Sequence, residues 1–260
     1  MEFRIASTFS DSLQKLTNTE QSAVKSTVVD LQLNPAHPGL QMHKLDKVKD
    51  QNFWSVRANQ DVRLIIHRNV ASILVCYVDH HDKAYKWAEN RKIEVHPKTG
   101  AAQIVELRES VKEIFVPKYV EAEMPKRPVF EGWSDDRLLG FGVPSEWLDD
   151  VKAVTSEDQP LQLVEALPGE ASDSLLTIAD GGTPEVPITT PTAKDPFDHP
   201  DALRRFRVMN DVDELNAALE FPWDKWAIFL HPAQREIVTK NFNGPARVSG
   251  SAGTGKTIVA

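Results

Sequence analysis

The chain is 260 residues long, with 41% apolar and 26% charged residues and a net charge of −8. These are ordinary values for a globular protein, and they exclude a wholly disordered chain and a collagen-like repeat. The single cysteine, Cys76, excludes a disulfide-stapled scaffold, and its place in an apolar run predicts a buried thiol. The length predicts two folded units with connecting chain.

Charge is unevenly distributed along the chain. Residues 1–95 hold thirteen Lys and Arg against eleven Asp and Glu, a net of +2, which leaves −10 for the remainder. The acidic total argues against a protein that simply coats nucleic acid, and the asymmetry predicts units with different roles. No stretch approaches the ~20 apolar residues of a membrane span, and no secretory signal is present. We therefore expect a soluble, cytoplasmic protein without a membrane partner.

The first segment, residues 1–95, is predicted to be an α+β domain with two helices on an antiparallel sheet. Hydrophobic spacing predicts the second of these helices. It stops before Asn34-Pro35, because the residue before a proline is disfavoured in the helical conformation. Links of hairpin length between the next strands predict an antiparallel meander. The expected elements are a strand at 2–7, helices at 11–16 and 20–33, strands at 53–58, 62–68 and 73–78, and a helix at 82–92.

The middle of the chain, residues 96–179, is predicted to be acidic and mostly helical, with an amphipathic helix over 103–123. Proline and glycine without apolar periodicity predict a linker at 180–200. The last segment, 201–260, is expected to begin a further domain with a strand at 204–209 and a helix at 211–219. Asp211 and Glu214 resemble a capping box at the start of that helix.

A phosphate-binding loop is the sharpest motif in the sequence. It satisfies the pattern G-x-x-x-x-G-K-[ST] at every fixed position, between a predicted strand and an apolar helix start. Its residues are Gly250, Ser251, Ala252, Gly253, Thr254, Gly255, Lys256 and Thr257. The glycines let successive N–H groups converge on a phosphate, Lys256 offers a charge to the β- and γ-phosphates, and the Thr257 hydroxyl can ligate Mg²⁺. The sequence therefore predicts ATP and Mg²⁺ as cofactors.

Gln234 lies upstream of this loop, in the stretch His231-Pro232-Ala233-Gln234. An amide side chain can donate to and accept from an adenine edge at once. Together, these two segments resemble the opening of the first motor domain of UvrD/Rep-like superfamily 1 DNA helicases, an α/β P-loop NTPase domain. The resemblance covers about residues 220–260 and implies that Gln234 contacts adenine, that Lys256 and Thr257 bind phosphate and magnesium, and that DNA is a partner.

Hydrolysis by such a motor also needs an acidic motif and arginines that follow later in the family. Because the chain stops at Ala260, we expect it to be the N-terminal piece of a longer helicase and not to hydrolyse ATP by itself. Trp223, Trp226 and Phe229 form an aromatic stripe beside the glutamine motif, for which core packing is favoured over base stacking.

Residues 61–68 and 77–85, with the order of elements around them, resemble the RelE/ParE toxin superfamily. The resemblance covers about residues 1–95 and implies mRNA cleavage on the ribosome or action on gyrase. By position, Arg63 matches an arginine that stabilises phosphate charge, His80 a basic residue after the last strand, and Tyr85 an aromatic of the last helix. His81 stands where many relatives have arginine. Imidazoles with an arginine can supply acid–base chemistry at a phosphate, and Lys44, Lys47 and Lys49 can hold an RNA backbone.

Structural roles for the same residues remain open from the sequence. His80 and His81 can form a surface turn or bind a metal, although no third ligand lies at an obvious spacing. Arg63 can pair with Asp61 or Asp79, and Tyr85 can belong to the core. The fused domain can also be an inactive module that docks nucleic acid or a partner protein to the motor.

Overall fold

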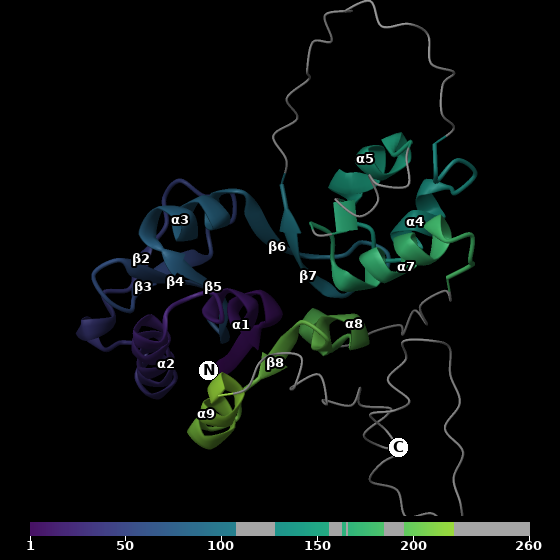
Figure 1. Ribbon diagram of the computed structural model, residues 1–260. Coiled ribbons are helices and arrows are strands. Elements are labelled where there is room, and N and C mark those ends of the chain that lie inside the picture. The colour runs from purple at the N-terminus through teal and green to yellow at the C-terminus, as the bar shows by residue number, and fades with distance from the viewer. Residues whose placement is uncertain (108–127, 156–162, 165, 185–194, 221–260) are drawn as a thin grey trace, which may run out of the picture. The chain divides into compact units, whose positions relative to one another are not determined.

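The computed structural model describes residues 1–107, 128–155, 163–164, 166–184 and 195–220. The chain is a mixed α/β protein with two compact units (Figure 1). The first holds Met1–Glu89 and the described part of Pro200–Ala260, and the second is Asn90–His199. Every helix within the described ranges is too short or too polar to span a bilayer.

The first unit is built on a six-stranded sheet with the order β2-β3-β4-β5-β1-β8. Its N-terminal elements are β1 (Glu2–Ala6), α1 (Ser7–Leu13), α2 (Asn18–Leu33), η1 (Pro38–Leu40), β2 (His43–Lys44), β3 (Phe53–Arg57), β4 (Val62–Arg68), β5 (Ser72–His80) and α3 (His81–Glu89). The elements that follow the second unit are α8 (Pro200–Leu203), β8 (Phe206–Val208) and α9 (Val212–Glu220).

The prediction of a purely antiparallel sheet is wrong at one strand pair. The meander β2–β3–β4–β5 is antiparallel as expected, but β1 runs parallel to β5, with Ile5 opposite Val75. Helices α1 and α2 carry the chain from β1 across the sheet to β2 at the far edge, so β1 enters beside a strand that is distant in sequence. A parallel neighbour requires such a crossover, whereas a hairpin does not.

Helix α1 completes the hydrogen bonding of β5 where β1 ends. β1 pairs with residues 72–75 of β5. Beyond that point, the Val78 N–H donates to the Ser12 hydroxyl at 3.1 Å, and the Thr8 hydroxyl donates to the Cys76 carbonyl at 2.6 Å. Buried backbone groups need partners, which explains why two hydroxyl residues lie on this helix face. Cys76 is a buried thiol, as predicted, and burial raises its pKa.

The main core of the first unit lies between the sheet and helices α1, α2 and α9. Alternate strand residues point into it because successive side chains face opposite sides of a sheet. They include Ile5, Val56, Leu64, Ile66 and Val78 from the strands, Phe9 and Leu13 from α1, Val24, Val28 and Leu31 from α2, and Leu215 and Leu219 from α9. Helix α3 packs on the opposite face, where Trp87 stacks on Tyr77 with ring centroids 4.7 Å apart.

The strand and helix expected to open the last segment are instead part of the first unit. β8 pairs antiparallel with β1, with Ile5 opposite Arg207, and the Gln32 amide of α2 donates to the Met209 carbonyl at 3.1 Å. The compact units divide the chain close to the boundaries expected at 95 and 200, but the described segment after Pro200 joins residues 1–89 in one unit and does not begin a separate domain. The reason is that β8 covers an edge of the sheet, which would otherwise expose unpaired backbone groups.

The second unit combines a two-stranded sheet with short helices. β6 (Arg91–Val95) and β7 (Ala102–Glu106) form an antiparallel hairpin. Residues 103–106 were expected to lie at the start of a helix over 103–123, but Ile104 pairs with Ile93 across the hairpin. Residues 108–123 of that expected helix lie outside the described ranges. The other elements are α4 (Asp135–Gly140), η2 (Ser145–Trp147), α5 (Leu148–Ala153), α7 (Gly169–Ala179) and η3 (Pro196–Asp198).

A buried histidine ties the turn of this hairpin to the helical part of the second unit. His96 Nδ1 accepts from the backbone N–H of Thr99 at 3.1 Å, and Nε2 lies 3.0 Å from the Val143 carbonyl. Trp147 is also buried, and its indole N–H donates to the Glu106 carbonyl at 2.9 Å. These contacts join β6 and β7 to the core formed with α4, α5 and α7.

Candidate functional site

The four predicted site residues of the first unit lie along one end of its sheet. Arg63 is the second residue of β4, and His80 is the last residue of β5. His81 and Tyr85 occupy the first two turns of α3. Their contacts separate them into different groups.

Arg63 holds the turn between β3 and β4. Its guanidinium donates to the carbonyls of Asn59 at 2.9 Å and Gln60 at 3.3 Å. Asn59 in turn accepts the N–H groups of Asp61 and Val62 through its side chain, the usual way in which asparagine stabilises a turn. Among the described residues, Arg63 forms neither of the ion pairs with Asp61 or Asp79 that the sequence left open.

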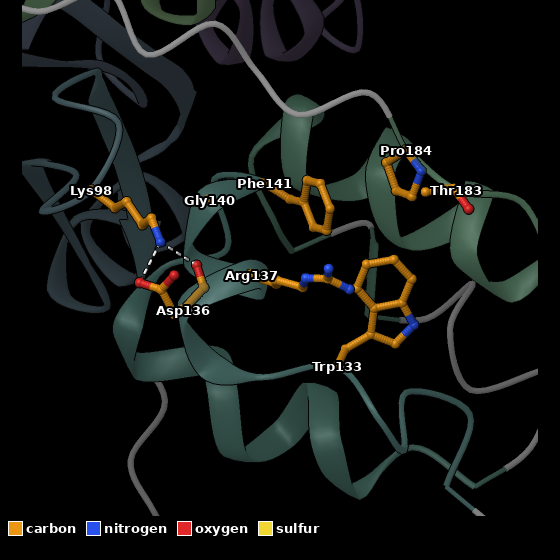
Figure 2. Close-up of a pocket in the computed structure, with 8 residues that line it drawn as sticks. All are labelled: Lys98, Trp133, Asp136, Arg137, Gly140, Phe141, Thr183 and Pro184. Carbon is orange, nitrogen blue, oxygen red and sulfur yellow. Dashed lines mark hydrogen bonds and ion pairs between the residues drawn. The ribbon is translucent and has the colours of Figure 1, made fainter.

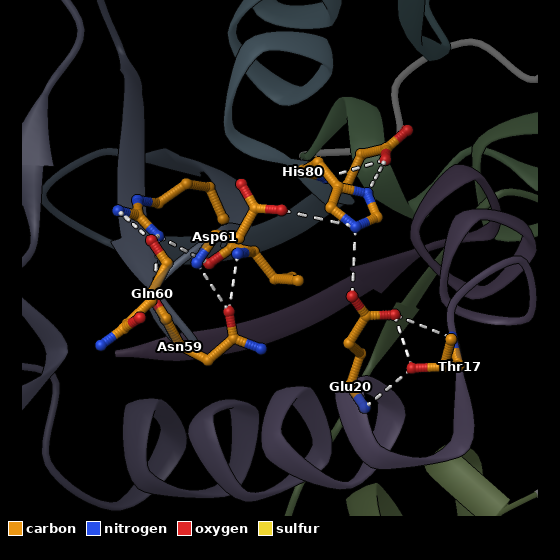
Figure 3. A network of polar contacts seen from close by, with 9 residues as sticks. Thr17, Glu20, Asn59, Gln60, Asp61 and His80 are labelled. Atoms are coloured by element: carbon orange, nitrogen blue, oxygen red, sulfur yellow. Dashed lines mark hydrogen bonds and ion pairs between the residues drawn. The ribbon is translucent and has the colours of Figure 1, made fainter.

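His80 lies between three carboxylates that come from three parts of the fold (Figure 3). Its Nε2 atom is 3.1 Å from Glu20 Oε1 and 3.6 Å from Asp61 Oδ2, and its Nδ1 atom is 3.1 Å from Asp79 Oδ1. The other oxygen of Glu20 accepts from the Thr17 hydroxyl and N–H, which completes a capping box at the start of α2. When the ring is protonated, both of its nitrogens are donors, and each of them then has a carboxylate acceptor.

The electrostatics of this group favour a protonated His80 and ionised carboxylates around it. Hydrogen bonding to Asp79, reinforced by Asp61 and Glu20, raises the pKa of His80 despite some desolvation. Thr17 hydrogen bonds, followed by His80, lower the pKa of Glu20. Burial opposes ionisation of Asp79, but hydrogen bonds from His80 and Tyr77 outweigh it and lower the pKa of that carboxyl. His80 therefore acts as a clasp between α2, the β3–β4 turn and the end of β5.

Replacing His80 with glutamine is expected to remove a pH-dependent part of the stability of the first unit. Because the folded-state pKa is raised above 6.5, the stabilisation is complete below pH 6.5 and is lost as the pH rises through the folded-state value. The His80 side chain is 43% exposed, so the loss is about 1 kcal/mol or less. Urea unfolding at a series of pH values from 5.5 to 8.5 measures it.

The matched control for this experiment is His81→Gln. His81 pairs with Asp82, whose side chain is fully exposed, so this variant should keep the pH dependence of the wild-type protein. Parallel stability curves for His80→Gln and the wild-type protein across the whole range would contradict the clasp.

Tyr85 is the centre of a second polar group. Its hydroxyl lies 2.9 Å from His43 Nε2 and donates to the buried Ser55 hydroxyl at 3.3 Å. The His81 ring meets the Tyr85 ring edge-to-face, with centroids 4.2 Å apart. A phenol flanked by two imidazoles is thus held between β2, β3 and α3. The Tyr85 group is defined here as Tyr85, His43, His81 and Ser55.

The sheet separates the His80 clasp from the Tyr85 group. His80 is opposite Val62, which is buried in the core beneath α1 and α2, and Arg63 is opposite Asp79. Directly opposed residues share a face and consecutive residues alternate, so His80 and Arg63 point to opposite faces. Ser55 is opposite Ile65, which lies two residues after Arg63, so the Tyr85 group is on the Arg63 face.

The sequence did not predict that several residues of these groups contact the site. His43 is 42 residues before Tyr85 and lies on a two-residue strand, so no local spacing connects the two. Glu20 follows Thr17 by three residues in the pattern of a capping box. That pattern could have predicted the place of Glu20 at the start of α2. Asp61 was considered as a partner of Arg63, whereas the structure places its carboxylate beside His80.

The nucleotide-binding motif lies outside the described residues. This applies to Gln234, to Gly250–Thr257 with the magnesium ligand Thr257, and to the aromatic stripe Trp223, Trp226 and Phe229. Within the described ranges, no group of three or more His, Cys, Asp or Glu side chains is arranged to hold a metal ion.

A pocket of about 230 Å³ lies in the second unit. Trp133 and Phe141 meet edge-to-face at 5.6 Å, and the Arg137 guanidinium lies 5.6 Å from the Trp133 ring centre. Figure 2 shows the Lys98 ammonium ion-paired with Asp136, which neutralises that cation. None of the predicted site residues lines this pocket.

Comparison with known proteins does not assign this chain to a family. No protein-family model and no curated protein matches the chain. A solved structure, the crystal structure of YafQ from E. coli strain BL21(DE3), is similar over 32% of this chain and 96% of that chain, with 13% sequence identity and a TM-score of 0.29. A superposition with so low a TM-score does not define a shared fold.

Proposed function

We propose that this chain binds ATP with Mg²⁺ through residues 250–257 and belongs to an ATP-dependent DNA helicase of superfamily 1. The observation that carries the proposal is the octapeptide from Gly250 to Thr257, which fits the phosphate-loop pattern at every fixed position. Gln234 upstream supports the adenine-binding part of the proposal. In the full-length protein, the motor would translocate on single-stranded DNA.

Each residue of the loop has a physical role in this proposal. Glycine at 250, 253 and 255 would allow the backbone N–H groups to surround a phosphate, and the helix that the sequence predicts after the loop would direct its positive end to the same anion. Lys256 would offer a positive charge to the β- and γ-phosphates, and the Thr257 hydroxyl would be a ligand of Mg²⁺. Hydrolysis needs acidic and arginine motifs beyond this loop, so turnover is proposed for the full-length helicase.

Titration calorimetry with Mg²⁺ and a non-hydrolysable ATP analogue tests the proposal. The wild-type chain should bind, and Lys256→Ala should weaken binding by about 10- to 100-fold, because a charged hydrogen bond contributes about 1.5–3 kcal/mol. Lys240→Ala, which changes a lysine outside the motif, is the control and should bind as the wild type does. Equal affinity of Lys256→Ala and wild type would contradict a phosphate loop, and unchanged ATPase turnover in full-length Lys256→Ala would contradict the motor.

A second candidate function concerns the first unit alone: cleavage of RNA at the Tyr85 group. The specific observation is a phenol held within 2.9 Å of one imidazole and packed against another. RNA cleavage needs a base to take the proton of a 2′-hydroxyl, which attacks the adjacent phosphorus, and an acid to protonate the leaving 5′-oxygen. Two histidines beside one tyrosine have the required chemistry, because an imidazole can accept a proton or donate one.

The matched variants His43→Gln and His80→Gln test this candidate. We expect His43→Gln to reduce cleavage of a labelled RNA oligonucleotide by about 10²-fold or more, whereas His80→Gln should cleave normally, because His80 points to the other face of the sheet. Binding of RNA without cleavage, unchanged in His43→Gln, would instead identify the unit as a docking module.

A further inference from the structure

A second pocket of the first unit, of about 270 Å³, lies between the segment after α2 and strands β3 and β4. Trp54 of β3 and Arg68 of β4 line it together with residues of the segment after α2, among them Pro35, His37, Gln41 and Met42. No aspartate or glutamate lines the pocket. Trp54 is half-buried and packs against the core of the first unit, in which α2 contacts β4 (Figure 1).

Arg68 has no anionic partner among the described residues. Its guanidinium lies 5.4 Å from the centre of the Trp54 ring, and its Nη1 atom donates to the Met42 sulfur at 3.1 Å. A thioether is a weak acceptor, whereas a guanidinium presents five donors that suit a phosphate or a carboxylate. The side chain is half-buried, so its charge is held in place beside an apolar wall.

The other polar side chains of the pocket also present donors. His37 Nδ1 accepts from the Gly39 N–H at 3.2 Å, so in the neutral ring Nε2 carries the proton. The Gln41 side-chain oxygen accepts from Arg57 at 2.9 Å, which leaves its NH₂ group as a donor. Gln41 has φ 42°, a left-handed conformation that is costly for a residue with a side chain. The polar side chains of the lining can therefore donate to an anion.

Lys44 adds a second cation on the same face of the sheet. It is directly opposite Trp54 in the β2–β3 pair, and opposed residues share a face. Lys44 is exposed and has no ion pair among the described residues. His43, the preceding residue, points to the other face and belongs to the Tyr85 group, so the two sites are separate.

We propose that this pocket, with Lys44, binds a strand of single-stranded nucleic acid. One phosphate contacts Arg68 and a neighbouring phosphate contacts Lys44, while a base lies against the apolar wall of Trp54, Met42 and Pro35. Positive side chains that follow the backbone, combined with an aromatic side chain for the bases, are the common means of binding single strands. An acidic peptide would satisfy the cations but would leave the aromatic wall without a flat partner. This proposal requires neither the motor nor cleavage at the Tyr85 group; Lys44, which the sequence suggests as a contact to an RNA backbone, here binds the strand beside Trp54 and Arg68.

Fluorescence anisotropy with a labelled 15-nucleotide oligo-uridine, without ATP, tests the proposal on the whole chain. Arg68→Gln should weaken binding by about tenfold or more. It should also reduce the slope of log K against log salt by about 0.7, the value for one lost phosphate contact on a single strand. Lys44→Gln should have the same effect on the slope, and because Lys44 is exposed this variant tests the proposal even if Arg68→Gln perturbs folding. Trp54→Leu should weaken binding by about tenfold with the slope retained.

Lys86→Gln, which removes an exposed lysine from α3, is the matched control and should bind as the wild type does. Failure of the wild-type chain to bind, or equal affinity of wild type, Arg68→Gln and Lys44→Gln, would overturn the proposal. Competition by a polyglutamate peptide as strong as that by unlabelled oligo-uridine would overturn it in favour of an acidic peptide. Equal competition by uridine monophosphate would overturn the strand in favour of a free nucleotide. None of these results depends on Lys256 or His43.

Discussion

Replacing Trp147 with alanine is expected to lower the free energy of unfolding of the second unit by about 3–5 kcal/mol. The Trp147 side chain is 1% exposed, and it packs in the core formed by α4, α5 and α7. Its removal leaves a large cavity, and it also leaves the Glu106 carbonyl without the indole N–H that satisfies it. Both losses act on the same contact between the hairpin and the helices.

Urea unfolding followed by hydrogen exchange of peptides from β6 and β7 measures this loss. Trp133→Ala is the matched control because Trp133 is only half-buried, at the rim of the pocket in Figure 2. It should cost less than Trp147→Ala. Equal losses for the two tryptophans would mean that Trp147 does not anchor the hairpin.

Replacing Leu215 with alanine is expected to destabilise the first unit by about 2–5 kcal/mol. Leu215 is fully buried in the core beneath α1 and α2, although the whole second unit separates it from those helices in sequence. The expected cavity lies under α9, where that helix contacts α2. Faster amide exchange in peptides from β1 and α2 is the measurement.

Asn216→Ala is the control for this prediction, since Asn216 is the next residue of α9 and is exposed. It should leave exchange in β1 and α2 unchanged. Wild-type protection of those peptides in Leu215→Ala would show that α9 contributes nothing to the core of the first unit.

Local patterns in the sequence predicted local structure well. The expected strand at 62–68 has the bounds of β4, and the helix expected to end before Pro35 ends at Leu33. The capping role predicted for Asp211 is confirmed, because its carboxylate accepts from the Glu214 N–H at 2.7 Å. These features depend on hydrophobic alternation, turn residues and proline, whose effects act within a few residues.

Pairings between distant segments could not be predicted in the same way. Nothing local distinguishes a parallel β1–β5 pair from an antiparallel one, or shows that Phe206–Val208 returns to β1. The short apolar run Ile104-Val105 is compatible with a helix or a strand, and tertiary pairing with β6 decides in favour of the strand. The candidate site follows the same rule: Tyr85 was predicted, but its partner His43 is 42 residues away.

The connectivity of the first unit has a thermodynamic consequence. The chain leaves it after Glu89 and re-enters at Pro200, so the second unit is an insertion between two parts of one sheet. Pairing β8 with β1 closes a loop through that insertion, and the entropy lost on closure grows with the number of free residues in the loop. Folding of the inserted unit shortens the free part of the loop, so it lowers this entropy cost. The stability of the host sheet is therefore linked to the folding of its insertion through the covalent chain alone.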